Sequence, residues 1–120
     1  MKRRVLAAVT DMFFAAKIRG TAEAVGVEVE FARTIEAAVE KALANMPALV
    51  VADLHAPSPD PFALAERFKS HERLSELPLM GFCSHVETAL QERARRAGFG
   101  RVLPRSAFSS RLPEILKGEF

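Results

Sequence analysis

Short apolar runs alternate with longer segments of helical periodicity along the whole chain. The runs at 5–9 and 48–52 are apolar throughout, which is typical of strands covered on both faces of a parallel sheet. At 27–31 apolar and acidic residues alternate, which indicates a strand with one exposed face. With two shorter apolar runs, the expected strands are 5–9, 27–31, 48–52, 79–82 and 102–103.

A stretch with apolar residues three or four positions apart follows each run, which predicts a helix after every strand. The expected helices are 14–25, 35–43, 62–68, 85–97 and 112–116. Thr34 and Asp60 are residue types that cap helix N-termini, and Gly26 is typical of a helix C-terminus. Ser84 and Glu87 have capping-box spacing, which predicts that the fourth helix begins directly after Ser84.

Successive strand–helix repeats predict a parallel sheet with helices on both faces. Right-handed crossovers restrict the arrangement further, and the natural order for five strands is 2-1-3-4-5. We therefore expect one domain over residues 1–120, a flavodoxin-like three-layer αβα sandwich with a five-stranded sheet and five helices. Ligands of such folds bind at the carboxyl ends of the strands, where the strand order reverses.

The composition is that of an ordinary globular protein, with 49% apolar and 27% charged residues in a chain of 120. The formal net charge is +2 and no basic stripe is evident, so we expect no nucleic-acid partner. No apolar run is long enough to span a bilayer, so we expect no membrane partner. The single cysteine, Cys83, excludes an intrachain disulfide and is consistent with a cytoplasmic location.

Polar and chemically active side chains gather in the segments that follow the predicted strands. They are Thr10, Asp11, Asp53, His55, Cys83, Ser84, His85 and Arg105. Because strands one and three are neighbours, Asp11 and Asp53 should approach one another, and two close carboxylates repel unless a cation lies between them. That cation is either Mg²⁺ or the guanidinium of Arg105. The pairing of Arg105 with Asp53 is the most specific structural expectation.

Three segments resemble the receiver domains of two-component response regulators. Residues 51–57, Val-Ala-Asp-Leu-His-Ala-Pro, resemble the third strand, acceptor aspartate and proline loop of that family. Residues 78–84 resemble its proline-led fourth strand, and residues 97–105 resemble its Ala-Gly motif and fifth strand. The resemblance covers nearly the whole chain. It implies protein partners such as a histidine kinase or a downstream signalling protein.

In receivers the aspartate after strand three accepts a phosphoryl group, which is held by Mg²⁺, a strand-four hydroxyl and a strand-five lysine. The resemblance places Asp53 at the acceptor position and Asp11 at one of the two paired acidic positions. These two residues are therefore the candidate Mg²⁺ ligands. The other acidic position is occupied by Thr10, which removes a charge and should weaken metal binding.

The positions that would hold the phosphoryl group also depart from the family pattern. Cys83 stands at the hydroxyl position, with Ser84 one residue later. Arg105 stands at the lysine position, followed by Ser106 instead of proline, and Val102 replaces the aromatic switch residue. A thiol is a poor hydrogen-bond donor, and an arginine can lock the acceptor aspartate in an ion pair. We expect weak Mg²⁺ binding at most, and no other cofactor.

We interpret the chain as a stand-alone atypical receiver, or pseudo-receiver, that acts by protein–protein interaction without efficient phosphorylation and is not an enzyme. One alternative is a genuine phosphoacceptor that a histidine kinase phosphorylates on Asp53. Another is a flavodoxin-like protein that binds a small ligand or metal. Structural roles stay open for Asp11 and Ser84 as helix caps and for Cys83 as a small buried hydrophobe.

A transition-metal site is considered because His55, His85 and Cys83 all follow strands at this edge. No two of them have a recognised ligand spacing, so the sequence favours ordinary loop histidines over metal ligands.

Two surfaces are candidates for partner binding. In receivers the fourth helix, fifth strand and fifth helix commonly bind a partner or a second copy. In this chain that face spans about 86–116, and its candidate basic residues for an acidic partner are Arg93, Arg96, Arg101 and Arg111. Met12 and Phe13 directly follow Asp11, and they would mark a partner surface if their side chains are exposed.

Overall fold

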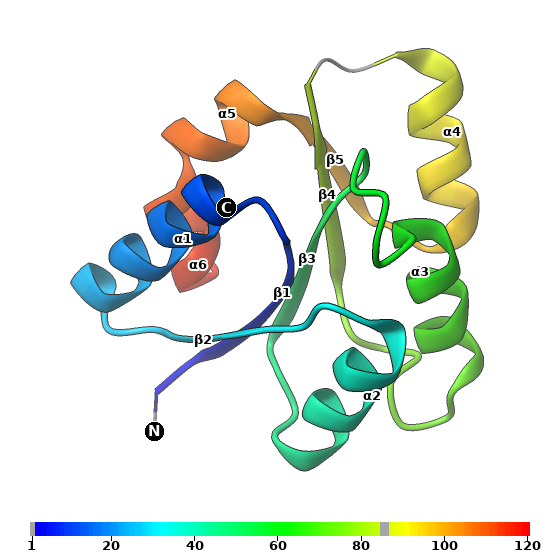
Figure 1. The fold of residues 1–120 in the computed structure, drawn as a ribbon, viewed down its shortest axis with the longest axis horizontal. Coiled ribbons are helices and arrows are strands. Elements are labelled where there is room, and N and C mark those ends of the chain that lie inside the picture. The colour runs from blue at the N-terminus through cyan, green and yellow to red at the C-terminus, as the bar shows by residue number, and fades with distance from the viewer. Residues whose placement is uncertain (1, 85–86) are drawn as a thin grey trace.

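The sheet of the computed structural model, which describes residues 2–84 and 87–120, has the predicted topology. In these residues five parallel strands are ordered β2-β1-β3-β4-β5 (Figure 1). Their bounds are β1 (Arg4–Ala8), β2 (Glu28–Phe31), β3 (Leu49–Asp53), β4 (Leu79–Cys83) and β5 (Arg101–Pro104). Ala52 of β3 pairs with Ala8 of β1 and with Gly81 of β4, so the central strands end at a common edge.

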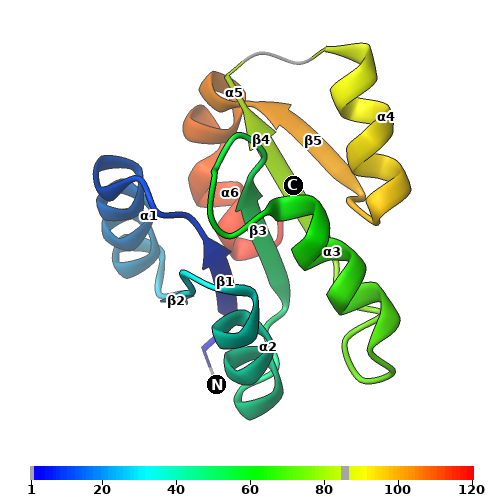
Figure 2. The same ribbon diagram turned by 45° about the vertical axis from the view of Figure 1, so that its right-hand side comes forward.

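Helices cover both faces of the sheet. In the described part of the chain they are α1 (Met12–Val25), α2 (Ile35–Ala44), α3 (Pro61–Ser70), α4 (Thr88–Ala97), α5 (Arg105–Ser110) and α6 (Leu112–Lys117). α1, α5 and α6 pack on one face, and α2, α3 and α4 pack on the other (Figures 1 and 2). None of these described helices is long and apolar enough to cross a membrane.

The C-terminal segment contains two short helices where we expected one, so the described residues form six helices rather than five. The break lies at Arg111, whose φ of −103° and ψ of 10° separate α5 from α6. Pro113 in the first turn of α6 explains the break. It has no N–H to donate, and its ring crowds the carbonyl four residues earlier, so one continuous helix cannot pass through it.

The predicted capping box of α4 is wrong. Glu87 has an extended backbone, with φ −111° and ψ 147°, and is itself the N-cap residue. Because Glu87 is outside the helix, it cannot be the third helical residue that a capping box requires. Ser84 is exposed and precedes the helix. His85 and Val86 lie outside the described residues.

The other local expectations are confirmed. Thr34 accepts a hydrogen bond from the N–H of Ala37 at the start of α2, and Asp60 accepts one from Phe62 at the start of α3. Gly26 ends α1 with a φ of 73°, a left-handed conformation that glycine adopts without steric cost.

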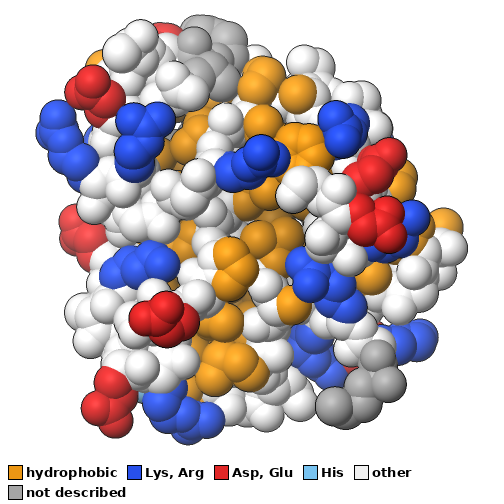
Figure 3. Space-filling model, turned by 180° about the vertical axis from the view of Figure 1, so that it is seen from behind, with side chains coloured by type: hydrophobic (Ala, Val, Ile, Leu, Met, Phe, Trp, Pro, Cys, Tyr) orange, Lys and Arg blue, Asp and Glu red, His pale blue; other side chains and the backbone are white. Residues whose placement is uncertain are grey.

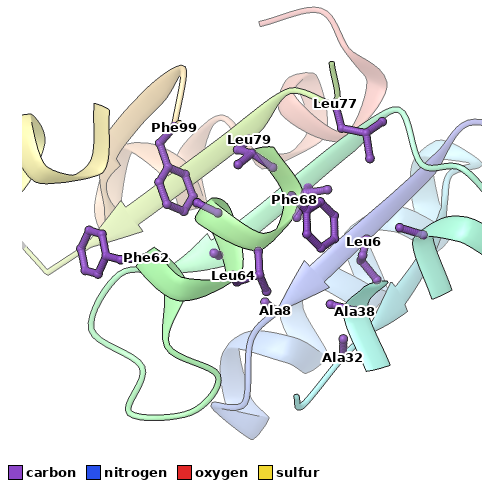
Figure 4. Close-up of a cluster of buried hydrophobic side chains, with 14 of the residues drawn as sticks. Leu6, Ala8, Ala32, Ala38, Phe62, Leu64, Phe68, Leu77, Leu79 and Phe99 are labelled. Atoms are coloured by element: carbon purple, nitrogen blue, oxygen red, sulfur yellow. The ribbon is translucent and has the colours of Figure 1, made fainter. Parts of the chain in front are cut away.

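Two apolar clusters, one on each face of the sheet, form the core. On the first face Leu64 and Phe68 of α3 lie near Leu6 and Ala8 of β1, while Phe62 lies to one side at the start of α3 (Figure 4). The second cluster contains Phe14 of α1, Phe82 of β4 and Phe108 of α5 among its buried residues. This second cluster lies beneath the candidate site.

The close approach of β4 to the first cluster gives a test of packing. A Cβ atom at Gly81 would lie 2.8–3.0 Å from side-chain carbon atoms of the buried Leu54. We expect Gly81→Ala to lower the free energy of unfolding by about 1–3 kcal/mol, because the core would be overpacked. Gly20→Ala is the matched control, since a Cβ atom there has no neighbour within 4 Å. It should raise stability by about 0.5–1 kcal/mol in the same urea titration. Equal effects of the two substitutions would contradict this account.

Candidate functional site

The carboxyl edge of the sheet brings together two carboxylates and one guanidinium. Asp11 lies between β1 and α1, Asp53 ends β3, and Arg105 begins α5 directly after β5. Arg105 Nη1 lies 3.6 Å from Asp11 Oδ2, and Arg105 Nη2 lies 3.5 Å from Asp53 Oδ2. The expected pairing of Arg105 with Asp53 is therefore present. The same guanidinium also reaches Asp11, so it bridges both acids.

The remaining oxygen of each carboxylate is held by the backbone. Asp11 Oδ1 accepts hydrogen bonds from the N–H groups of Phe13 and Phe14, at 2.9 and 3.1 Å. Asp53 Oδ1 accepts one from the N–H of His55, at 2.9 Å. Asp11 thus caps α1 and faces the pocket at the same time, which combines the two roles considered from the sequence. Both carboxylates are orientated by their own loops before any ligand binds.

Three phenylalanine rings support the guanidinium from below. Arg105 Cζ lies 4.7 Å from the ring centre of Phe14 and 5.6 Å from that of Phe82. Phe82 in turn stacks on Phe108, with ring centres 4.6 Å apart. A guanidinium over an aromatic face gains a cation–π attraction, and the stacked rings restrict where it can lie. Sequence analysis missed this platform, because the three rings come from three distant elements and share no local motif.

The environment of Asp11 favours its charged form. The hydrogen bond from the N–H of Phe14 is the largest cause, and it lowers the pKa of Asp11 below the ordinary value of 3.8. Partial burial opposes this effect, while the N–H of Phe13 and the charge of Arg105 lower the pKa further.

Cys83 is 1% exposed and belongs to the first apolar cluster, as expected for a small buried hydrophobe. Its Sγ lies 3.8 Å from the carbonyl oxygen of Leu103. Burial raises the pKa of the Cys83 thiol, and the negative charges of Asp53 and Glu87 raise it further. The thiol is therefore protonated at neutral pH. It is not a reactive thiolate.

The other predicted pocket residues take no part in the bridge between the carboxylates and Arg105. Thr10 is half-buried and Ser84 is exposed. In the part of the chain that the structure describes, neither residue hydrogen-bonds to Asp53 or Arg105. His55 is exposed, and His85 lies outside the described residues. Among residues 2–84 and 87–120, no group of three or more His, Cys, Asp or Glu side chains could hold a metal.

The carboxylate pair does not fit Mg²⁺ in this arrangement. Mg²⁺ needs oxygen ligands at about 2.1 Å in a nearly octahedral shell. The guanidinium of Arg105 lies between the two Oδ2 atoms that would be the ligands, and its positive charge repels a dication. Thr10 stands where a further acid would add negative charge. The charge of the two carboxylates is already balanced in part by Arg105.

The predicted basic face is exposed. Arg93 and Arg96 lie on α4, Arg101 on β5, and Arg111 between α5 and α6. Arg93 lies over the ring of Phe62 at 3.9 Å, while the side chain of Arg96 is 80% exposed beside Glu92. The other two flank one aromatic ring, with Arg101 Cζ 4.3 Å and Arg111 Cζ 4.7 Å from the ring centre of Phe120. The view from behind shows Lys and Arg side chains on both sides of an apolar band (Figure 3).

Comparison with known proteins finds similarity at the level of structure. Neither the models of protein families nor the curated proteins gave a match. The chemotaxis response regulator CheY4 of Vibrio cholerae superposes with a TM-score of 0.85 at 17% identity, covering 100% of both chains. A CheY-like receiver domain protein from Methanospirillum hungatei gives 0.81 at 19% identity, covering 99% of this chain and 94% of its own. The receiver domain of a histidine kinase from Syntrophus aciditrophicus gives 0.77 at 19%, covering 97% and 91%.

These similarities show that the chain has the receiver-domain fold of response regulators, as the sequence resemblance implied. At such low identities the similarity extends to the fold alone. What the protein does has to be argued from its own carboxyl edge and surfaces.

The lowered pKa of Asp11 predicts how stability depends on acid. The pKa of Asp11 is lower in the folded protein than its ordinary value of 3.8, so the charged carboxylate stabilises the fold at a pH above 3.8. This contribution disappears as the pH falls through the pKa of the folded state. Asp11→Asn retains a capping residue and removes only the charge. We expect the variant to be less stable than the parent at neutral pH, and the difference to vanish in strong acid. Parallel urea-unfolding curves at every pH would contradict the assignment.

Proposed function

We propose that this protein is a receiver-type signalling module that binds other proteins and does not take up phosphoryl groups efficiently. In typical receivers the carboxylates at this edge hold Mg²⁺, which neutralises the incoming phosphoryl group. Here the guanidinium of Arg105 takes the place of the metal between Asp11 and Asp53. That bridge is the observation that supports the proposal.

The bridge weakens phosphoryl transfer in two ways. Phosphoryl transfer depends mostly on positioning and on charge stabilisation by metal and lysine, and the side chain at the lysine position is engaged with the carboxylates instead. Asp53 Oδ2, the oxygen that would attack, is also paired with a cation. The residues around it do not compensate, because Thr10 adds no charge and Cys83 is a protonated, buried thiol.

A basic face composed of Arg93, Arg96, Arg101 and Arg111 is the proposed partner surface. All four residues are exposed. Three of the side chains lie over an aromatic ring, and Arg96 pairs with Glu92. These contacts reduce the conformational entropy that the side chains lose on binding. The arginines form two pairs, Arg93 with Arg96 beside α3 and Arg101 with Arg111 around Phe120. Both pairs favour an acidic partner over a second copy of this chain, because like charges would oppose each other in a symmetric dimer.

The phosphorylation part of the proposal is tested by intact-mass spectrometry with Mg²⁺ and a small-molecule phosphodonor. We expect no phosphate adduct on the parent protein. Arg105→Lys combined with Thr10→Asp should gain an adduct, because the fork that bridges the carboxylates is removed and an acid is added. Adding Asp53→Asn to that variant should abolish the adduct. An adduct on the parent protein that Asp53→Asn removes would contradict the proposal.

That contrary outcome corresponds to the second candidate function, a genuine phosphoacceptor. One observation favours it: both ion pairs are long, and the Arg105 side chain is 41% exposed. Such pairs contribute about 0–1 kcal/mol each, so a kinase docking at this edge could displace the guanidinium at low energetic cost.

The partner surface is tested by charge reversal. Arg96→Glu with Arg101→Glu should abolish capture of the acidic partner on a column that carries the protein. The matched control is Arg33→Glu with Arg67→Glu, which changes the net charge equally at other exposed positions. Retention of the same proteins by both variants would rule out this face.

A further inference from the structure

We propose that a pocket at the amino-terminal edge of the sheet binds a small aromatic carboxylate. This edge is opposite the one that carries Asp11, Asp53 and Arg105, so the site is separate from the bridged carboxylates. The size of the pocket, its apolar floor, two guanidiniums without a carboxylate partner and an aromatic ring at its rim all point to this class of ligand.

The pocket has a volume of about 280 Å³ and lies where the strands begin. It is lined by Leu49, Leu79 and Arg101, the first residues of β3, β4 and β5, and by Gly118 and Phe120, which follow α6. Small-molecule sites usually enclose about 300–1,000 Å³. A pocket at the lower end of this range favours a ligand built on a single ring over one as large as a dinucleotide.

The floor of the pocket is apolar. Leu79, Met80 and Ile115 line it, and all three side chains are buried. Leu79 belongs to the first apolar cluster, while Met80 and Ile115 belong to the second, so the pocket opens at the place where the two clusters reach the edge of the sheet. Such a floor favours the apolar body of a ligand over a fully hydrated ion.

Two guanidiniums line the pocket without a carboxylate partner. Arg3 Nε donates to the carbonyl oxygen of Leu116 at 2.8 Å, which fixes one side of that guanidinium. Gly118 makes room for it, because a Cβ atom there would lie 2.8–3.0 Å from the Cζ and Nη atoms of Arg3. Among residues 2–84 and 87–120, no carboxylate lies within ion-pair distance of Arg3 or Arg101. A singly charged carboxylate fits a guanidinium fork, and it costs less to desolvate over an apolar floor than a phosphate dianion.

Phe120 provides an aromatic wall beside these charges. Its ring centre lies 4.3 Å from Arg101 Cζ and 4.7 Å from Arg111 Cζ, and these two cation–π contacts restrict where the ring can lie. An aromatic ligand can pack against this ring while its carboxylate faces the guanidiniums. An inorganic anion would gain nothing from the ring or the floor, and a neutral aromatic compound would leave the guanidiniums without a partner. The pocket therefore selects a molecule that carries both groups.

The test is a titration of the ¹⁵N-labelled protein with 3-phenylpropionate, followed by the amide NMR signals. We expect saturable shifts in residues 79–80, 100–101 and 115–120, and an affinity that falls with added salt. The neutral analogue 3-phenylpropanamide should bind at least about tenfold more weakly, because the charge-assisted hydrogen bonds are lost. Acetate has the charge but no ring, and it should give no saturable shifts at the same concentrations.

Two variants with matched controls test the residues of the pocket. Arg101→Gln should weaken binding of 3-phenylpropionate by at least about fivefold, whereas Arg33→Gln removes the same charge at an exposed position outside the pocket and should bind like the parent protein. Phe120→Ser should also weaken binding, whereas Met46→Ser removes another exposed apolar side chain and should not. Since all four positions are exposed, the Tm should change little.

Several outcomes would overturn the proposal. They are the absence of shifts at the pocket, equal binding of the amide, saturable binding of acetate, and unchanged binding by Arg101→Gln or Phe120→Ser. Shifts centred on residues 11, 53 and 105 would also overturn it, because the ligand would then occupy the opposite edge of the sheet. None of these outcomes alters what is expected of phosphorylation, which is tested separately at that opposite edge.

Discussion

The contact of Arg105 with Asp11 and Asp53 is the interaction on which the proposed function rests. It joins three elements at the carboxyl edge: the start of α1, the end of β3 and the start of α5. The ring of Phe14 beneath the guanidinium belongs to the same helix that Asp11 caps. The start of α1 thus positions both the acid and the ring that Arg105, at the start of α5, contacts.

The bridge matters more for the electrostatics of the pocket than for the stability of the fold. Its two ion pairs are long and partly exposed, so each contributes about 0–1 kcal/mol. The cation–π contact adds about 0.5–1 kcal/mol. The fold is stabilised chiefly by the two apolar clusters on either side of the sheet. What the guanidinium changes is the charge between the carboxylates, which decides whether a metal and a phosphoryl group are attracted there.

Much of this could be predicted from the sequence, because it follows from alternation and topology. Buried runs followed by helical spacing predict the parallel sheet, and the strand order then brings Asp11, Asp53 and Arg105 to one edge. Two local expectations were not met. The spacing of Ser84 and Glu87 indicates a capping box, but the extended backbone of Glu87 places it outside the helix. Pro113 divides the terminal segment into two helices.

The helical spacing of Phe14 with Ile18 predicts that Phe14 faces the core, but the aromatic platform and the degree to which Phe13 is exposed could not be read from the sequence. Phe13 and Phe14 are adjacent and chemically identical, yet one is 92% exposed and the other 8%. Which of the two faces the core depends on the rotation of α1 against the sheet. That rotation is set by Ile18 and Ala22 in contact with residues from distant strands.

The central claim is that Arg105 lies between Asp11 and Asp53, where typical receivers hold Mg²⁺. A crystal structure of the protein grown at high Mg²⁺ concentration tests this claim directly. We predict that the guanidinium remains between Asp11 and Asp53 and that no metal density appears between the carboxylates. A Mg²⁺ ion at about 2.1 Å from oxygens of both aspartates, with Arg105 displaced into solvent, would contradict the account.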